Sequence, residues 1–138
     1  MSVKRKLTPA DLERELIATM RSVLADPRKA VRRFQALRTR ALRRKWKSLA
    51  TSCLVQMRLA GGAYGAWDQE LGIARRLVRE APATQYYFWL GGALERNGRL
   101  GDALTAYRQA IELASEGDKA RECYVQSVER IRKIEEDQ

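Results

Sequence analysis

The most constraining part of the sequence is residues 84–117, where two small residues occupy matching places on successive amphipathic stretches. Gly91 lies on the first stretch and Ala103 on the second, and Gly98 separates them. Glycine readily adopts the left-handed conformation that ends a helix. The pattern therefore predicts two antiparallel helices that cross closely where Gly91 and Ala103 meet. Further apolar residues recur at helical spacing around that crossing: Tyr87, Leu90, Leu94, Tyr107 and Ala110.

The same window resembles a tetratricopeptide (TPR) repeat. An aromatic residue and a Leu-Gly pair on the first helix precede an Ala-x3-aromatic pattern on the second, although Ser115 replaces the family's closing proline. A more divergent copy precedes it at residues 51–83, with Glu70 where the family has a small alanine. The resemblance implies helical hairpins stacked as a short right-handed α-solenoid.

Helical patterns continue on both sides of the repeats. Thr8, Pro9 and Asp11 are typical of a helix start, as are Asp26 and Pro27. We expect further helices over residues 67–80 and 120–134, the last as a cap on the array. No alternating strand pattern occurs, so the sequence predicts an all-α fold of about six to seven helices.

The length of 138 residues suits a single domain. Within it we expect a basic tail at 1–7, N-terminal helices at 8–50, TPR-like repeats at 51–117 and a capping helix at 118–138. About three repeats are usually needed for stability. Either the N-terminal helices act as a third hairpin, or a second copy of the chain supplies the missing surface in a homodimer.

Helix boundaries between residues 27 and 65 are open. No glycine or proline interrupts residues 30–59, so one long helix and two shorter ones both fit. Trp46 would fall on the polar face of a continuous helix, which indicates either a break near residues 45–48 or a contact made by Trp46. Gly61, Gly62 and Gly65 predict a break at the end of this stretch.

Positive charge is concentrated in the first half of the chain. Residues 1–66 hold 16 basic and 4 acidic side chains, a net +12, whereas residues 67–138 hold 11 and 13, a net −2. At ~100° per residue, Ala30, Val31, Phe34, Leu37, Ala41, Leu42 and Leu49 share an inner face. The opposite face is basic and carries Arg28, Lys29, Arg32, Arg33, Arg40, Arg43, Arg44, Trp46 and Lys47.

This basic face is open to several interpretations. It fits an acidic protein surface, or a nucleic acid with Trp46 stacked on a base. An arginine-rich amphipathic helix also fits anionic lipid, and a charged face is often simply solvated. The arginine excess is in addition typical of a GC-rich genome.

The resemblance also implies a concave groove that binds a peptide or helix. Carried over by position, the groove residues are Val55, Leu59, Gln85, Phe88, Glu95 and Arg96. Val55, Leu59 and Phe88 would form an apolar floor, and Arg96 would bind a carboxylate. Core packing is the alternative role of Phe88. The dense basic ring of a chaperone-tail clamp is absent, so that partner is not assigned.

Catalysis is not expected. The chain has no histidine, and Cys53 and Cys123 lie far apart without a nearby base, so we expect two reduced thiols, no metal and no cofactor. A signal peptide and a membrane span are not expected either, which favours the cytoplasm. The predicted function is a non-catalytic TPR-type protein-interaction adaptor, with nucleic-acid binding through residues 28–47 as the alternative.

Overall fold

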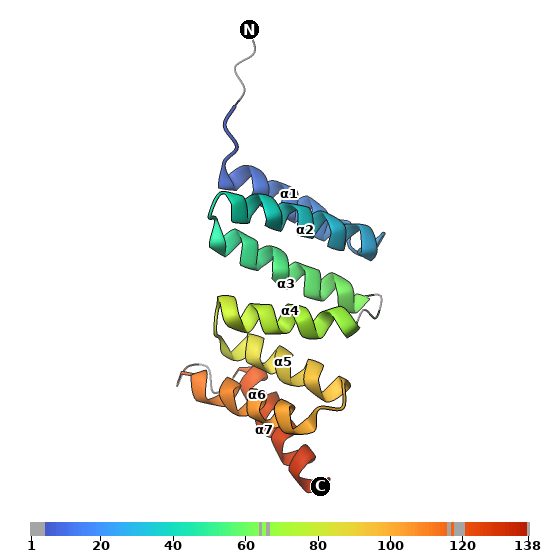
Figure 1. The fold of residues 1–138 in the computed structure, drawn as a ribbon, viewed down its shortest axis with the longest axis vertical. Helices are drawn as coiled ribbons and strands as arrows, with labels where there is room; N and C mark the ends of the chain where they lie inside the picture. The colour runs from blue at the N-terminus through green and yellow to red at the C-terminus, as the bar shows by residue number, and fades with distance from the viewer. Residues whose placement is uncertain (1–4, 64, 66, 116, 118–120, 138) are drawn as a thin grey trace. The chain divides into compact units, whose positions relative to one another are not determined.

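The computed structural model describes residues 5–63, 65, 67–115, 117 and 121–137. These residues form seven α-helices and no strand (Figure 1). The chain divides into two compact units, Met1–Ala66 and Trp67–Gln138, which we call the N-terminal unit and the C-terminal unit. The predicted all-α class of packed, TPR-like helices is confirmed, and each unit is described by itself below.

The N-terminal unit contains α1 (Pro9–Arg21), α2 (Pro27–Arg43) and α3 (Lys47–Ala63), and α2 packs against both of its neighbours. The start of α1 is a capping box, as Thr8 and Asp11 each bind the other's backbone N–H. The Asp11 carboxylate accepts hydrogen bonds from the backbone N–H and then the hydroxyl of Thr8, and these lower the pKa of Asp11 to about 2. The buried apolar core comprises Leu12, Leu16, Ala30, Phe34, Leu37, Ala41, Ala50, Cys53, Leu54, Met57 and Ala60.

A turn at residues 44–46 separates α2 from α3, which answers whether residues 27–60 form one helix or two. Lys45 adopts a left-handed conformation with φ of 61°. Its N–H donates to Leu42 O at 3.0 Å, and the N–H of Trp46 donates to Ala41 O at 2.9 Å. These two bonds define a Schellman motif, which usually has glycine where Lys45 lies.

Two details of the N-terminal unit can be compared with the sequence-based expectation. The break predicted from Gly61, Gly62 and Gly65 falls at the last of the three glycines: α3 continues through Gly61 and Gly62 to Ala63, and Gly65, beyond its end, has φ of 73°. Leu42, predicted to face inward, is 46% exposed. It lies at the edge of the apolar face in the last turn of α2, so little of it reaches the core.

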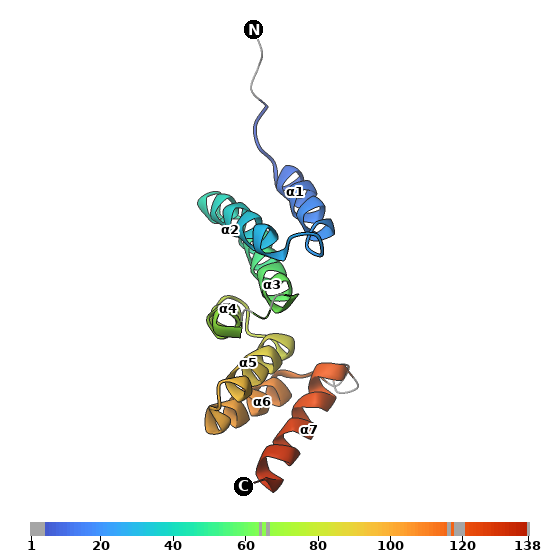
Figure 2. The ribbon, with the colours of Figure 1, turned by 90° about the vertical axis from the view of Figure 1, so that its right-hand side faces the viewer.

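The C-terminal unit contains α4 (Trp67–Glu80), α5 (Thr84–Arg96), α6 (Leu100–Leu113) and α7 (Glu122–Glu136). Helix α5 contacts α4, α6 and α7, and α7 also packs on α6 (Figure 2). One buried cluster lies at the centre of this packing, with contributions from α5, α6 and α7. Its members are Leu94, Ala103, Leu104, Ala106, Tyr107 and Ile134.

The α5–α6 hairpin has the close crossing that the sequence predicts. A Cβ atom added to Gly91 would lie 2.6 Å from Cε1 of Tyr107, so only glycine leaves room for that ring. Gly98 has φ of 75° and forms the turn. The hydroxyl of Thr84, at the start of α5, donates to Ala110 O near the end of α6 at 2.9 Å, as expected of antiparallel helices.

Helix α7 covers the end of this hairpin. Ile134 enters the buried cluster, and Arg108 of α6 forms an ion pair with Glu135 at 2.6 Å. The predicted last helix is therefore confirmed, with its start at Glu122. Residues 118–120 and residues 1–4 of the predicted basic tail lie outside the described residues.

Candidate functional site

The predicted basic face lies on the outer side of α2 and continues across the turn to α3. Most of its members are exposed: Arg28, Lys29, Arg32, Arg33, Arg43, Arg44 and Lys47. Arg40 and Trp46 are half-buried. We call this set of nine residues the basic surface. The helical periodicity agrees with the exposure of Arg28, Lys29, Arg32, Arg33 and Arg43 on α2, whereas Arg44 and Lys47 lie beyond the end of that helix.

Arg38 shows why position on the helix decides the role of an arginine here. It lies at ~280° from Arg28 around α2, within the apolar face, and is only 3% exposed. Its Nη1 donates to Ala50 O of α3 at 2.9 Å. Arg38 therefore joins two helices of the core, and it contributes nothing to the basic surface.

Acidic partners are few in the N-terminal unit. Asp11 pairs with Arg5 and Arg14 on α1, and Glu15 pairs with Arg40. Among the described residues, no carboxylate lies within ion-pair distance of Arg32, Arg33 or Arg43. The net charge of +12 is therefore directed mainly toward solvent.

Trp46 does not form an open stacking platform. The ring is half-buried, and the guanidinium carbon of Arg44 lies 5.7 Å from its centroid. This is the geometry of a cation–π contact. Trp46 therefore packs at the α2–α3 turn, which explains an aromatic residue within a basic sequence.

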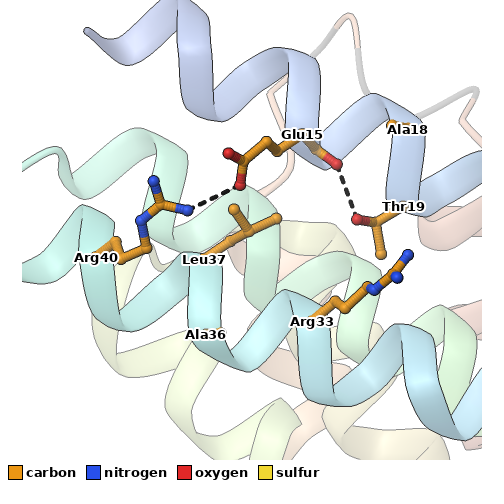
Figure 3. A pocket seen from close by; sticks show the side chains of 7 residues that line it. All are labelled: Glu15, Ala18, Thr19, Arg33, Ala36, Leu37 and Arg40. Atoms are coloured by element: carbon orange, nitrogen blue, oxygen red, sulfur yellow. Dashed lines mark hydrogen bonds and ion pairs between the residues drawn. The ribbon is translucent and has the colours of Figure 1, made fainter. Parts of the chain in front are cut away.

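A groove lies between α1 and α2 beside the basic surface (Figure 3). Its volume is about 330 Å³, and its lining is mainly apolar. Figure 3 shows the α1 side chains above those of α2, with the guanidinium of Arg40 directed at the carboxylate of Glu15. We call it the α1–α2 groove, and it is lined by Glu15, Ala18, Thr19, Arg33, Ala36, Leu37 and Arg40.

The residues predicted for a concave groove are divided between the two units. Val55, half-buried, and Leu59, 49% exposed, belong to α3 of the N-terminal unit. Gln85 is exposed on α5 of the C-terminal unit. Phe88 packs against the buried cluster, with its ring centroid 6.0 Å from that of Tyr107. Phe88 thus has a core contact, and the binding role of this residue set stays a prediction.

Glu95 and Arg96 both form ion pairs within the C-terminal unit. Arg96 donates its Nε to Glu70 of α4 at 3.0 Å, and its Nη2 donates to the second oxygen of that carboxylate. Glu70 is 6% exposed. Glu70, which stands where the family has a small residue, therefore binds Arg96. We had expected the guanidinium of Arg96 to bind a ligand carboxylate.

Glu95 connects three helices. It accepts Nε of Arg130 from α7 at 2.8 Å and the hydroxyl of Tyr107 from α6 at 2.8 Å. The hydrogen bond from Arg130 lowers the pKa of Glu95 below its ordinary value, and that from Tyr107 adds to the effect. Burial, with the nearby Glu95 carboxylate, raises the pKa of Tyr107. This arrangement holds the hairpin and α7 together, and no motif predicted it.

Neither cysteine forms a disulfide, and Cys53 is buried. Burial raises the pKa of Cys53 to about 11, which keeps it protonated at neutral pH. Within the described part of the chain, no group of His, Cys, Asp and Glu side chains could hold a metal ion. No helix among those residues is both long and apolar enough to cross a membrane.

Comparison with known proteins identifies the class of the repeat. The tetratricopeptide repeat family matches residues 84–116, the segment that forms α5 and α6. Searches of curated proteins and of solved structures found no match. The chain therefore contains a tetratricopeptide repeat, and repeats of this family generally mediate protein–protein interactions.

Proposed function

We propose that this protein is a non-catalytic interaction adaptor whose N-terminal unit binds an acidic segment of a partner protein. One observation carries the proposal: Arg32, Arg33 and Arg43 are exposed on one helix without a carboxylate partner among the described residues. Guanidinium groups bind carboxylates through paired hydrogen bonds. An acidic partner would supply the opposite charge that the N-terminal unit lacks.

Two features favour a protein partner over a nucleic acid. Trp46 is half-buried and already contacts the guanidinium of Arg44, so a base that stacks on the ring would compete with that contact. The basic surface also adjoins an apolar groove, which a phosphate backbone has no group to fill. Together with the repeat, these features support an acidic protein segment.

Of the residues predicted for a concave groove, Leu59 of the N-terminal unit and Gln85 of the C-terminal unit stay separate candidates for contact with a partner. Both side chains are exposed. The ion pair between Arg96 and Glu70 makes Arg96 a weaker candidate for a ligand carboxylate than Arg33. A location in the cytoplasm also stays a prediction.

The proposal is tested by the binding of a fluorescein-labelled glutamate-rich peptide, measured by anisotropy at several salt concentrations. Reversing three charges at once, Arg32→Glu, Arg33→Glu and Arg43→Glu, should raise the Kd about a hundredfold. Added salt should weaken binding to the unchanged protein, because exposed charges are screened. The matched control reverses three exposed arginines of α4 in the C-terminal unit: Arg75, Arg76 and Arg79.

The control should change the Kd by less than about threefold, since it alters the total charge equally but not the basic surface. Equal losses in both variants would mean that only net charge matters, and would contradict the proposal. A uridine oligonucleotide of the same charge serves as the alternative ligand. If it binds more tightly than the peptide, the surface is a nucleic-acid site.

A further inference from the structure

We propose that the α1–α2 groove receives an apolar side chain from an acidic amphipathic helix of the partner, and that Arg33 binds the carboxylate beside that side chain. This inference rests on the proposed function and specifies the partner. The groove adjoins the basic surface because Arg33 and Arg40 belong to both.

The floor of the groove is suited to an aliphatic side chain. Leu37 forms its base, and Ala18 and Ala36 leave space on either side because their side chains are short. Ala18 and Ala36 are exposed, one on each helix. At about 330 Å³, the space suits one or two side chains. Filling it would remove apolar surface from water, a contribution that charge alone does not supply.

The wall of the groove already shows how a carboxylate is bound there. Arg40 binds Glu15 through Nη1 at 2.8 Å, and the two side chains are 38% and 52% exposed. Arg33 lies seven residues earlier on α2, about 10 Å along the axis and on nearly the same side. It has no carboxylate partner among the described residues. Arg33 is therefore the equivalent position left open for an incoming carboxylate.

A helix is the form of partner that matches this spacing. Residues three or four apart on a helix lie side by side, so an acidic residue and an apolar residue can reach Arg33 and the groove together. The basic surface on α2 extends ~22 Å from Arg28 to Arg43. Acidic residues on further turns of the partner helix would meet Lys29 and Arg32, which lie outside the groove.

The test compares two helical peptides of equal charge, one with leucine and one with alanine on its apolar face. The leucine peptide should bind about tenfold more tightly, because only leucine fills the groove. Ala36→Trp occupies the groove from α2 and should abolish that advantage, and Ala18→Trp should do so from α1. The matched control is Gln35→Trp, which adds the same side chain at an exposed position on another face of α2.

Three results would overturn the inference. The first is equal binding of both peptides, and the second is no effect of Ala36→Trp. In either case, if reversing Arg32, Arg33 and Arg43 still weakens binding of the acidic peptides, the proposed function stands. If no acidic peptide binds at all, the proposed function and this inference are both wrong. The third is a dimer in light scattering that Ala36→Trp dissociates, because the occupant would then be a second copy of this chain.

Discussion

In the C-terminal unit charged side chains join helices, whereas in the N-terminal unit most of them face solvent. Between described residues of the C-terminal unit, ion pairs that connect different helices include Glu70–Arg96, Glu95–Arg130 and Arg108–Glu135. Among the described residues of the N-terminal unit, Arg40–Glu15 joins α1 and α2, while Arg32, Arg33 and Arg43 have no carboxylate. The change in net charge, from +12 to −2, falls at the boundary between the two units.

This difference distinguishes charged residues that stabilise the fold from charged residues that are accessible to a partner. An arginine whose guanidinium is bound by Glu95 or Glu70 has limited capacity for a partner. An exposed arginine without a carboxylate adds little to stability and keeps its hydrogen-bond donors for recognition. The family match covers residues 84–116 of the C-terminal unit, and we propose that the N-terminal unit supplies the recognition chemistry.

The largest effect on stability should come from Gly91→Ala in the C-terminal unit. The new Cβ would lie within 2.8 Å of three ring atoms of Tyr107, which is 2% exposed and cannot move away freely. We expect a loss of about 2–3 kcal/mol in the free energy of unfolding, measured by urea denaturation. The control is Gly72→Ala on α4, where nothing lies within 4 Å, and it should gain up to about 1 kcal/mol. Equal effects of both substitutions would contradict the close crossing.

Glu95→Gln should have the next largest effect, a loss of about 1–2 kcal/mol at pH 7, because it removes the charge that binds Arg130. The folded-state pKa of Glu95 is lowered by that hydrogen bond, so ionisation stabilises the fold. This stabilisation is complete above the unfolded-state pKa of about 4.3 and is lost as the pH falls through the lower folded-state value.

The stability difference between wild type and Glu95→Gln should therefore shrink on acidification from neutral pH. Urea denaturation at a series of pH values measures it. A difference that stays constant down to the acid limit would mean that the ion pair contributes nothing.

The smallest effect should come from the two Schellman turns, one in each unit. Gly98 and Lys45 both have positive φ, but lysine is strained in that conformation. Lys45→Gly should stabilise the protein by about 0.5–1 kcal/mol, whereas Gly98→Ala should destabilise it by about 1 kcal/mol. Thermal unfolding followed by circular dichroism measures both. Destabilisation by Lys45→Gly would show that the lysine side chain makes a contact more important than its backbone strain.

The fold was largely predictable because its determinants are local in the sequence. Gly91, Ala103 and Tyr107 occur at spacings that only closely packed helices satisfy, and the periodicity of α2 placed the basic surface on its outer side. The α2–α3 turn could not be fixed from sequence because Lys45 occupies a position where glycine is usual. Gly61 and Gly62 lie within α3, whereas Gly65, beyond its end, takes the positive φ of 73° that a glycine readily adopts.

The site was less predictable because it depends on side chains from different helices. The family pattern suggested Arg96 as a ligand residue, but its pairing with Glu70 depends on how α4 lies against α5. The α1–α2 groove likewise arises from the packing of two helices whose sequences contain no recognised motif. The residue that could have indicated this groove in the sequence is Glu15, an acidic residue on α1 that precedes a strongly basic helix.

The central claim is that the N-terminal unit carries the recognition surface. The most direct test is a titration of ¹⁵N-labelled protein with the acidic helical peptide that has leucine on its apolar face, followed by ¹H–¹⁵N correlation spectra. We predict that backbone amides of α2, together with Ala18 and Thr19 of α1, shift progressively while those of α4–α7 stay unchanged. Shifts confined to Gln85–Arg96 of α5 would contradict the claim and would place binding on the tetratricopeptide repeat itself.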